Sequence, residues 1–315
     1  MTKDELEEAD SVLKAHGNLF NADSAYLFCQ EQCQFGPRIM NSEAHEKCAQ
    51  YIISRFQQYG LKVISQQMTL TGYDGTKLNS TNIIASINPE ASYRVLVCAH
   101  WDSRPWADND IDEANHHTPV MAANDGASGV AVMLELARVL ADTALLGGKP
   151  DTGIDFICFD AEDWGTPQWA ENQENSEDTW ALGAQYWSEN PHIEGYKANY
   201  GILLDMVGGK GAHFYREGFS DYYARNIVDV VWSAANSLGY GNYFINSEGG
   251  TVTDDHKPIN EIARIPVIDV ISYYPDCQMS SFGPTWHTVN DTMENIDKNV
   301  LRAVGATLIA VLTLS

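Results

Sequence analysis

Three acidic residues directly follow an apolar run in the middle of the chain. The run Phe156-Ile-Cys-Phe predicts a buried strand, and Asp160, Glu162 and Asp163 come at its end. Neighbouring carboxylates repel one another and lose hydration, so a bound cation or a shared proton must offset that cost. Because Glu162 and Asp163 are adjacent, their side chains diverge, and one could hold a metal while the other carries protons. A solvated acidic loop is the alternative interpretation of this stretch alone.

Further candidate groups follow the other predicted strands or open a helix. They are His100 and Asp102 after one strand, Asp125 at a helix start, Asp205 at the end of a second strand and His287 beyond a third. Ligands of open α/β sheets bind at the carboxyl ends of the strands, so these side chains are expected to converge on one edge. Taken singly, each has an ordinary structural explanation, such as a helix cap. Their recurrence at successive strand ends favours a functional site.

The elements that would position these groups alternate along the chain. Strands are expected over 62–70, 78–87, 94–99, 156–160, 201–207 and 266–271. Helices are expected over 42–60, 126–140, 180–187, 220–238 and 300–311, with a short one beginning at 254–258. Strands alternating with helices predict a single catalytic α/β domain over 1–315, with a mixed, mostly parallel central sheet flanked by helices. Residues 1–40 are expected to form a helical N-terminal lead-in.

Composition and charge narrow the classes of function. The 315 residues, 44% hydrophobic and 20% charged, are typical of a globular protein with a sizeable core. The formal net charge of −24 argues against nucleic acid and anionic membrane surfaces as partners. No apolar stretch reaches the length that spans a bilayer. The first residues lack the apolar core of a signal peptide, which leaves the compartment open because such a segment can be removed.

The six cysteines do not show the short spacing of a zinc knuckle. Cys98 and Cys158 lie in apolar strands and are expected to be buried thiols. Cys29 and Cys33 are four positions apart, on one face of a helix, where two free thiols are favoured over a disulfide.

The ordered motifs resemble the co-catalytic zinc aminopeptidase clan. The motifs are His100-Trp-Asp102, Ala-Asn-Asp125-Gly-Ala-Ser-Gly, Phe-Asp-Ala-Glu162-Asp163, Leu-Leu-Asp205 and His287-Thr. The match runs from about Glu43 to the C-terminus, and the ordered set is specific although each motif alone is weak. The resemblance implies a zinc aminopeptidase-like (phosphorylase/hydrolase-like) fold.

Within that clan, the C-terminal part is similar to the glutaminyl-peptide cyclotransferases, or glutaminyl cyclases. The similarity is carried by Thr253-Asp254-Asp255-His256-Lys-Pro, Ile265-Pro-Val-Ile, Trp286-His287-Thr288 and Glu294-Asn295-Ile296-Asp297. A tryptophan directly before the ligand histidine is similar to the cyclase pattern. The stretch over 214–220 looks like that of a bacterial member.

The cyclase resemblance implies one Zn²⁺ per chain, held by Asp125, Asp163 and His287. Carboxylate oxygens and an imidazole with one position left open are typical of catalytic zinc. The family usually has Glu at the position of Asp163, so the shorter side chain would hold the metal closer to the strand end.

The resemblance also implies the catalytic and substrate-binding groups around the metal. Glu162 would carry the proton, with Asp205 and Asp254 hydrogen-bonded to it. Trp169 and Trp286 would wall the substrate pocket. Two positions depart from the family pattern: Trp169 matches only with a one-residue gap, which leaves Trp164 as the alternative, and Asp269 stands where the animal enzymes carry a histidine.

The implied activity is zinc-dependent cyclisation of N-terminal glutaminyl residues to pyroglutamate with release of ammonia. The α-amine attacks its own side-chain carboxamide, and Glu162 passes the proton to the leaving amine. The pocket mainly has to hold the reactive rotamer and exclude water. Expected partners are peptides or proteins with N-terminal Gln or Glu, and the chain is expected to be a monomer. The resemblance places it in the periplasm, or secreted or lipid-anchored in the full-length precursor.

Two other functions compete with this one. In a two-zinc aminopeptidase, His100 and Asp205 would hold a second metal with Asp125 bridging, and Glu162 would activate water. Metal stoichiometry, or release of ammonia rather than a free amino acid, separates the two enzymes. In a silent binding module the carboxylates would be merely structural.

The acidic loop Asp108–Asp112 could coordinate a hard cation, although a solvated loop is favoured. His116 and His117 are expected to be loop residues, because the proposed zinc site is complete without them.

Overall fold

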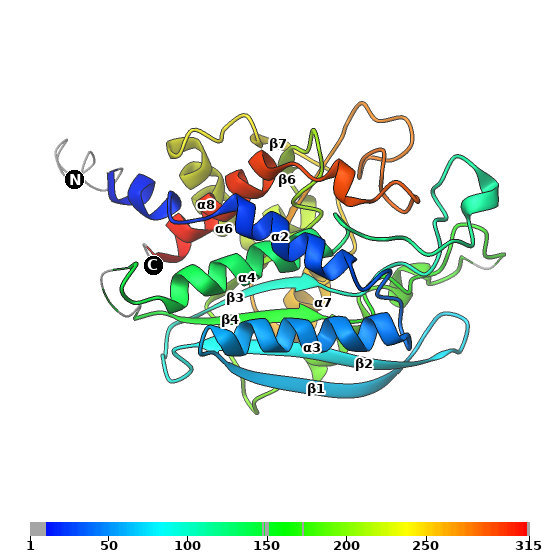
Figure 1. Cartoon of the computed structure of the whole chain (residues 1–315), viewed down its shortest axis with the longest axis horizontal. Helices are drawn as coiled ribbons and strands as arrows, with labels where there is room; N and C mark the ends of the chain where they lie inside the picture. The colour runs from blue at the N-terminus through cyan, green and yellow to red at the C-terminus, as the bar shows by residue number, and fades with distance from the viewer. Residues whose placement is uncertain (1–10, 147, 149–150, 172, 314–315) are drawn as a thin grey trace.

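A central six-stranded sheet lies between two layers of helices in the computed structural model, which describes residues 11–146, 148, 151–171 and 173–313 (Figure 1). The strand order is β1-β2-β4-β3-β5-β8. The strands are β1 (Lys62–Thr71), β2 (Lys77–Ile87), β3 (Arg94–His100), β4 (Gly153–Phe159), β5 (Tyr200–Asp205) and β8 (Val267–Ile271). The hairpin β1–β2 and the pair β2–β4 are antiparallel, whereas β4, β3, β5 and β8 run parallel. The predicted mixed, mostly parallel sheet is therefore confirmed.

The register of the parallel strands aligns their carboxyl ends. His100 pairs with Phe159 across β3 and β4, and Asp205 pairs with Ile271 across β5 and β8. The polar residues that end these strands or follow them therefore lie along one edge of the sheet.

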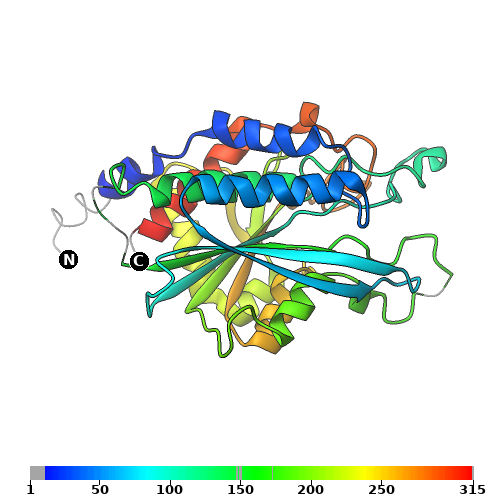
Figure 2. The same ribbon diagram turned by 60° about the horizontal axis from the view of Figure 1, so that its bottom comes forward.

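Helices bury both faces of the sheet. One face is covered by α2 (Ala22–Cys33), α3 (Glu43–Gln58), α4 (Ala127–Ala141) and α8 (Lys298–Thr313) (Figure 2). The other face packs against α5 (Leu182–Glu189), α7 (His256–Pro258) and the π-helical turn η3 (Ile259–Ala263). Within β3, Val95 and Val97 belong to the first core, whereas Leu96 and Cys98 belong to the second. Burial on both faces explains why the strands read as continuous apolar runs.

Local sequence signals fix the ends of α3 as expected. The Ser42 side chain accepts a hydrogen bond from the backbone N–H of His45, which caps the helix start. Gly60 follows the helix with a φ of 79°, a left-handed conformation that favours glycine.

Two features of the structure were not expected in this form. Of the predicted 1–40 lead-in, residues 1–10 lie outside the described part, and α2 packs on α4 and α8 as a member of the main core. The strands β6 (Phe214–Arg216) and β7 (Phe244–Glu248) form a second, two-stranded sheet. The predicted helix over 220–238 is confirmed: it is α6 (Gly218–Ser237), which lies between β6 and β7 in the sequence and packs on β8 and α8.

All six cysteines are free thiols, so the preference for two thiols at Cys29 and Cys33 agrees with the structure. Within the described ranges, we find no helix with the length and apolar character needed to cross a bilayer.

Candidate active site

The loop after β4, which carries Glu162 and Asp163, is held by Asp102 at the end of β3. The two carboxylate oxygens of Asp102 accept the backbone N–H groups of Glu162 and Asp163, each at 3.1 Å. Asp160, the first acid of the motif, points elsewhere: its Oδ1 lies 2.8 Å from Nε2 of His45. The three acids of the motif therefore have different roles, and Asp102 orients the loop.

The loop that carries Asp125 is held in a similar way from two sides. Asp291 accepts the backbone N–H groups of Asn124 at 2.8 Å and Asp125 at 3.1 Å. The buried guanidinium of Arg38 donates to the carbonyl oxygens of Met121 and Ala122. Neither Asp291 nor Arg38 was singled out from the sequence.

Asp125, Asp163 and His287 come together as predicted for the metal group. Nε2 of His287 lies 3.4 Å from Oδ2 of Asp125 and 3.2 Å from Oδ1 of Asp163. All three side chains are buried, and their ligand atoms lie within 4.8 Å of one another. Neither carboxylate oxygen of Asp163 accepts a hydrogen bond from any residue that the structure describes. Two carboxylates and one imidazole around such unsatisfied oxygens fit a catalytic zinc.

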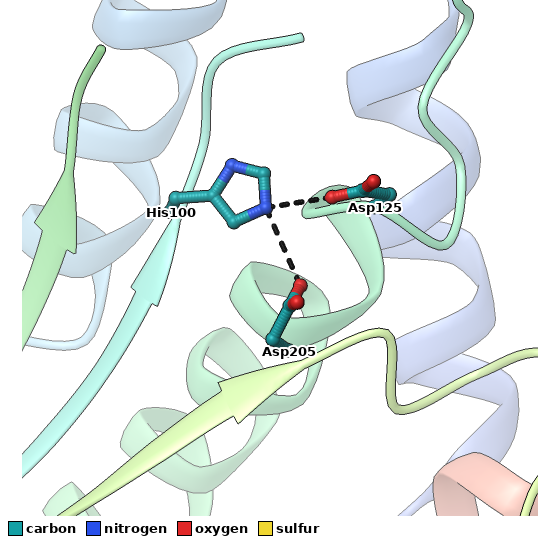
Figure 3. A group of neighbouring side chains, drawn as sticks. All are labelled: His100, Asp125 and Asp205. Atoms are coloured by element: carbon teal, nitrogen blue, oxygen red, sulfur yellow. Dashed lines mark hydrogen bonds and ion pairs between the residues drawn. The ribbon is translucent and has the colours of Figure 1, made fainter. Parts of the chain in front are cut away.

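A second group shares Asp125 with the first (Figure 3). Nε2 of His100 lies 2.9 Å from Oδ1 of Asp125 and 3.3 Å from Oδ1 of Asp205. Asp125 thus directs one oxygen to each group. Nε2 of His100 is hydrogen-bonded to Asp125, whereas Nδ1 of His100 and Oδ1 of Asp205 have no hydrogen-bond partner among the described residues, so this group too could hold a cation.

Glu162 is a buried carboxyl group suited to carrying a proton. Burial, the largest cause, raises the pKa of Glu162 well above its usual range; His100 opposes this shift and Asp254 adds to it. Burial also raises the pKa of Asp205 to about 7, with Asp125 as the next cause. Carboxyl groups with raised pKa values can give and take protons near neutral pH. The hydrogen bonds expected from Asp205 and Asp254 to Glu162 stay a prediction.

Asp254 neighbours a further buried group of polar side chains, which includes His256 and Asp269. His256 lies with Nε2 3.1 Å from Oε2 of Glu217 and with Nδ1 3.9 Å from Oδ2 of Asp269. Glu217 is itself fixed by the backbone N–H groups of residues 219, 220 and 252. Asp269, at the position where the animal enzymes carry a histidine, therefore belongs to a network behind the pocket.

The acids around the metal groups open onto a cavity of about 340 Å³ that is lined by both polar and aromatic side chains. Its polar lining includes Asp125, Glu162, Asp205, Asp254 and His287. Its aromatic lining is formed by Trp180, Phe282 and Trp286. Trp286 stacks on His287 with ring centroids 3.8 Å apart, so the predicted wall residue lies directly beside the metal group.

The wall that the sequence assigned to Trp169 is formed by Trp180. Trp169 is 39% exposed and contacts His117 and Trp106, with ring centroids at 4.6 and 5.9 Å, outside the cavity lining. Trp164, the alternative, also packs on Trp106. Trp180 lines the cavity and stacks on His287 at 5.8 Å with an angle of 8° between the rings. In the structure, Trp180 and not Trp169 therefore lines this cavity.

Removing the indole at position 286 is expected to weaken substrate use much more than folding. Trp286→Ala should raise KM by about tenfold or more, because a half-buried indole contributes on the order of 2 kcal/mol to a contact. Trp169→Ala is the matched control and should leave KM within about twofold. Initial rates and thermal unfolding of both variants check this. An unfolded Trp286→Ala protein would instead make Trp286 a core residue.

The acids of the loop Asp108–Asp112 make local contacts. Asp110 and Asp112 accept backbone N–H groups of Val289 and Ala114, both at 3.0 Å. Asp108 pairs with Arg104 and faces His287. None of these acids belongs to a metal-like group in the part of the chain that the structure describes. His116 and His117 pack in the same region, away from the cavity, as expected for loop residues.

Comparison with known proteins places this arrangement in a family. The sequence model of peptidase family M28 matches residues 82–312, more than half of the chain. The chain belongs to peptidase family M28. The glutaminyl-peptide cyclotransferase of Bothrops jararaca is 29% identical over 245 residues, which cover 69% of this M28 chain and 61% of that protein. The chain thus spans only about three fifths of the length of the curated relatives it matches.

Solved structures similar to this M28 chain cover almost all of it. The glutaminyl cyclase of Bacteroides thetaiotaomicron bound to N-acetylhistamine is 50% identical, with a TM-score of 0.90, over 94% of this chain and 98% of its own. A Zn-dependent exopeptidase from Parabacteroides distasonis is also 50% identical, with a TM-score of 0.89, over 94% and 99%. These similarities confirm the predicted zinc aminopeptidase-like fold.

Proposed function

We propose that this M28 chain cyclises N-terminal glutaminyl residues of peptides or proteins to pyroglutamate with release of ammonia. The observation that carries the proposal is Glu162, a buried carboxyl group with a raised pKa, on the wall of a tryptophan-lined cavity beside the metal group. The glutaminyl cyclase of Bacteroides thetaiotaomicron, similar over nearly the whole chain, supports it.

Asp125, Asp163 and His287 would hold one Zn²⁺ per chain. Bound there, zinc supplies a Lewis acid that polarises the side-chain carboxamide of the substrate. His100 and Asp205 with Asp125 form a second group that could hold a metal, so the proposal of one metal per chain rests on the resemblance to glutaminyl cyclases.

The protein's own residues then have three tasks. Glu162 takes a proton from the α-amine while the amine nitrogen attacks the carboxamide carbon, and it gives that proton to the amide nitrogen that leaves as ammonia. One C–N bond forms, one breaks, and no water is consumed. Asp205 and Asp254 keep the pKa of Glu162 high enough for it to accept a proton. The aromatic side chains of Trp180, Phe282 and Trp286 hold the folded substrate side chain and exclude water.

Ammonia release from a glutamine-led dipeptide tests the proposal. We expect an otherwise intact dipeptide that has lost one ammonia, identified by mass spectrometry. Free glutamine would mean hydrolysis of the peptide bond and would contradict the cyclase function.

A two-zinc aminopeptidase is the second candidate, because Asp125 directs one oxygen to each of the two groups. In that enzyme, His100 and Asp205 would help hold the second metal. Two metals per chain, together with free glutamine, would favour it.

The remaining parts of the proposal rest on the resemblance to glutaminyl cyclases. The proposal includes three such parts: substrates with N-terminal Glu, a monomeric state, and a periplasmic, secreted or lipid-anchored location.

A further inference from the structure

The buried guanidinium of Arg104 contacts several parts of the site at once. Arg104 is 1% exposed, and its Nε and Nη2 atoms donate to the carboxylate of Asp108 at 2.7 and 2.6 Å. Its Nη1 atom donates to the carbonyl oxygens of Asp163 at 3.0 Å and Gly165 at 3.2 Å. One side chain therefore joins the loop after β3 to the loop after β4.

Asp108 extends this contact to the metal group. Its Oδ1 lies 3.5 Å from Nδ1 of His287, whose Nε2 faces Asp125 and Asp163. A carboxylate behind a ligand histidine fixes the ring orientation and the tautomer. Because Arg104 also holds the backbone of Asp163, two of the three predicted ligands depend on it.

The planar face of Arg104 also supports the wall of the cavity. Its guanidinium carbon lies 4.6 Å from the ring centroid of Trp180, and Trp180 stacks on His287. Trp180 in turn packs on Gly165, where an added Cβ would lie only 2.0 Å from the indole. The indole is therefore held between the guanidinium, the loop backbone and the ligand histidine.

We propose that Arg104 is a positioning residue that fixes both the metal ligand His287, through Asp108, and the pocket wall Trp180, by two separate contacts. The flat, forked guanidinium makes the bidentate contact to Asp108 with its edge and the stacking contact to Trp180 with its face. A lysine keeps the charge but offers neither contact, so Arg104→Lys separates this role from charge alone. The kinetic consequence rests on the proposed function, whereas the consequence for the metal ligand does not.

Arg94 provides a matched control at the opposite end of β3. It makes the same bidentate contact, to Asp155, at 2.8 and 2.5 Å, far from the metal group along the strand. Arg94→Lys therefore removes a comparable bidentate ion pair and leaves the residues of the site unchanged.

The test measures chelator-driven metal release and KM in the same purified proteins. Arg104→Lys should release bound Zn²⁺ about tenfold faster and raise KM about tenfold, while Arg94→Lys changes both by less than about twofold. The absorption spectrum of the Co²⁺-loaded protein should shift in Arg104→Lys alone, because it reports the geometry around His287. An Arg104→Lys protein that changes only one of release and KM, or neither, would overturn the proposal.

Two further variants separate the two contacts and serve if Arg104→Lys does not fold. Asp108→Asn should speed metal release and leave KM within about twofold. Trp180→Leu should raise KM and leave the rate of metal release within about twofold. If Asp108→Asn does not change metal release and Trp180→Leu does not change KM, Arg104 does not act through these partners and the proposal is wrong. Should the unmodified chain release no ammonia from glutamine-led peptides, the proposed function fails, while metal release and the Co²⁺ spectrum still decide the role of Arg104.

Discussion

Glu162→Gln lowers kcat for the cyclisation of glutamine-led peptides by about a thousandfold or more, with the metal still bound. Glutamine has nearly the same shape as glutamate but cannot take a proton from the attacking amine or return it to the leaving nitrogen. The three predicted ligands lie on other residues, so metal content should not change. Ammonia release gives kcat, and elemental analysis of the dialysed variant gives the metal content.

Glu177→Gln is the matched control for this experiment. Glu177 lines the same cavity but is 72% exposed and pairs with Lys257. We expect its substitution to change kcat by no more than about threefold, because the carboxylate is exposed to solvent and its ion pair with Lys257 is weak. Full activity in Glu162→Gln would remove its assigned role, and joint loss of activity and metal would make Glu162 a ligand.

The second large effect is expected at the metal group. Asp163→Asn should weaken Zn²⁺ binding by about a hundredfold or more, since a neutral amide replaces a carboxylate that has no other hydrogen-bond partner among the described residues. Activity should then depend on added free Zn²⁺. Competition with a chromophoric chelator measures the affinity, and rates at increasing free Zn²⁺ measure the rescue.

Asp160→Asn tests whether this effect is specific to one acid of the motif. Asp160 is equally buried but pairs with His45 and the backbone N–H of Thr81, outside the metal group. Its substitution should lower the melting temperature without weakening Zn²⁺ binding. Equal metal affinities in Asp163→Asn and the unmodified chain would mean that Asp163 is not a ligand.

The sequence was sufficient to place the strand ends and the residues directly attached to them. Apolar runs such as Phe156–Phe159 mark strands buried on both faces, and parallel strands bring their carboxyl ends to one edge. Glu162 and Asp205 could therefore be assigned to one site before the structure was known. Their positions follow from local patterns plus one rule of sheet geometry.

Residues that act across loops could not be placed in this way. Trp180 replaces Trp169 because the chain between Gly165 and Trp180 is mostly irregular, so spacing along it does not predict which ring returns to the cavity. Arg104 contacts Asp163, Gly165 and Trp180, which lie far from it in the sequence. The sequence indicated a role for Asp291 only weakly, through its position four residues after His287. Only the structure shows that Asp291 holds the loop that carries Asp125.

The double backbone contacts of Asp102 and Asp291 determine when the ligand loops become ordered. Both acids hold the loops with hydrogen bonds made by the protein alone. The conformational entropy of these loops is therefore lost during folding and not when a cation arrives. If this site binds Zn²⁺ as proposed, the ion would enter loops that are already ordered, so its occupancy would follow the free Zn²⁺ concentration without a change in the rest of the fold.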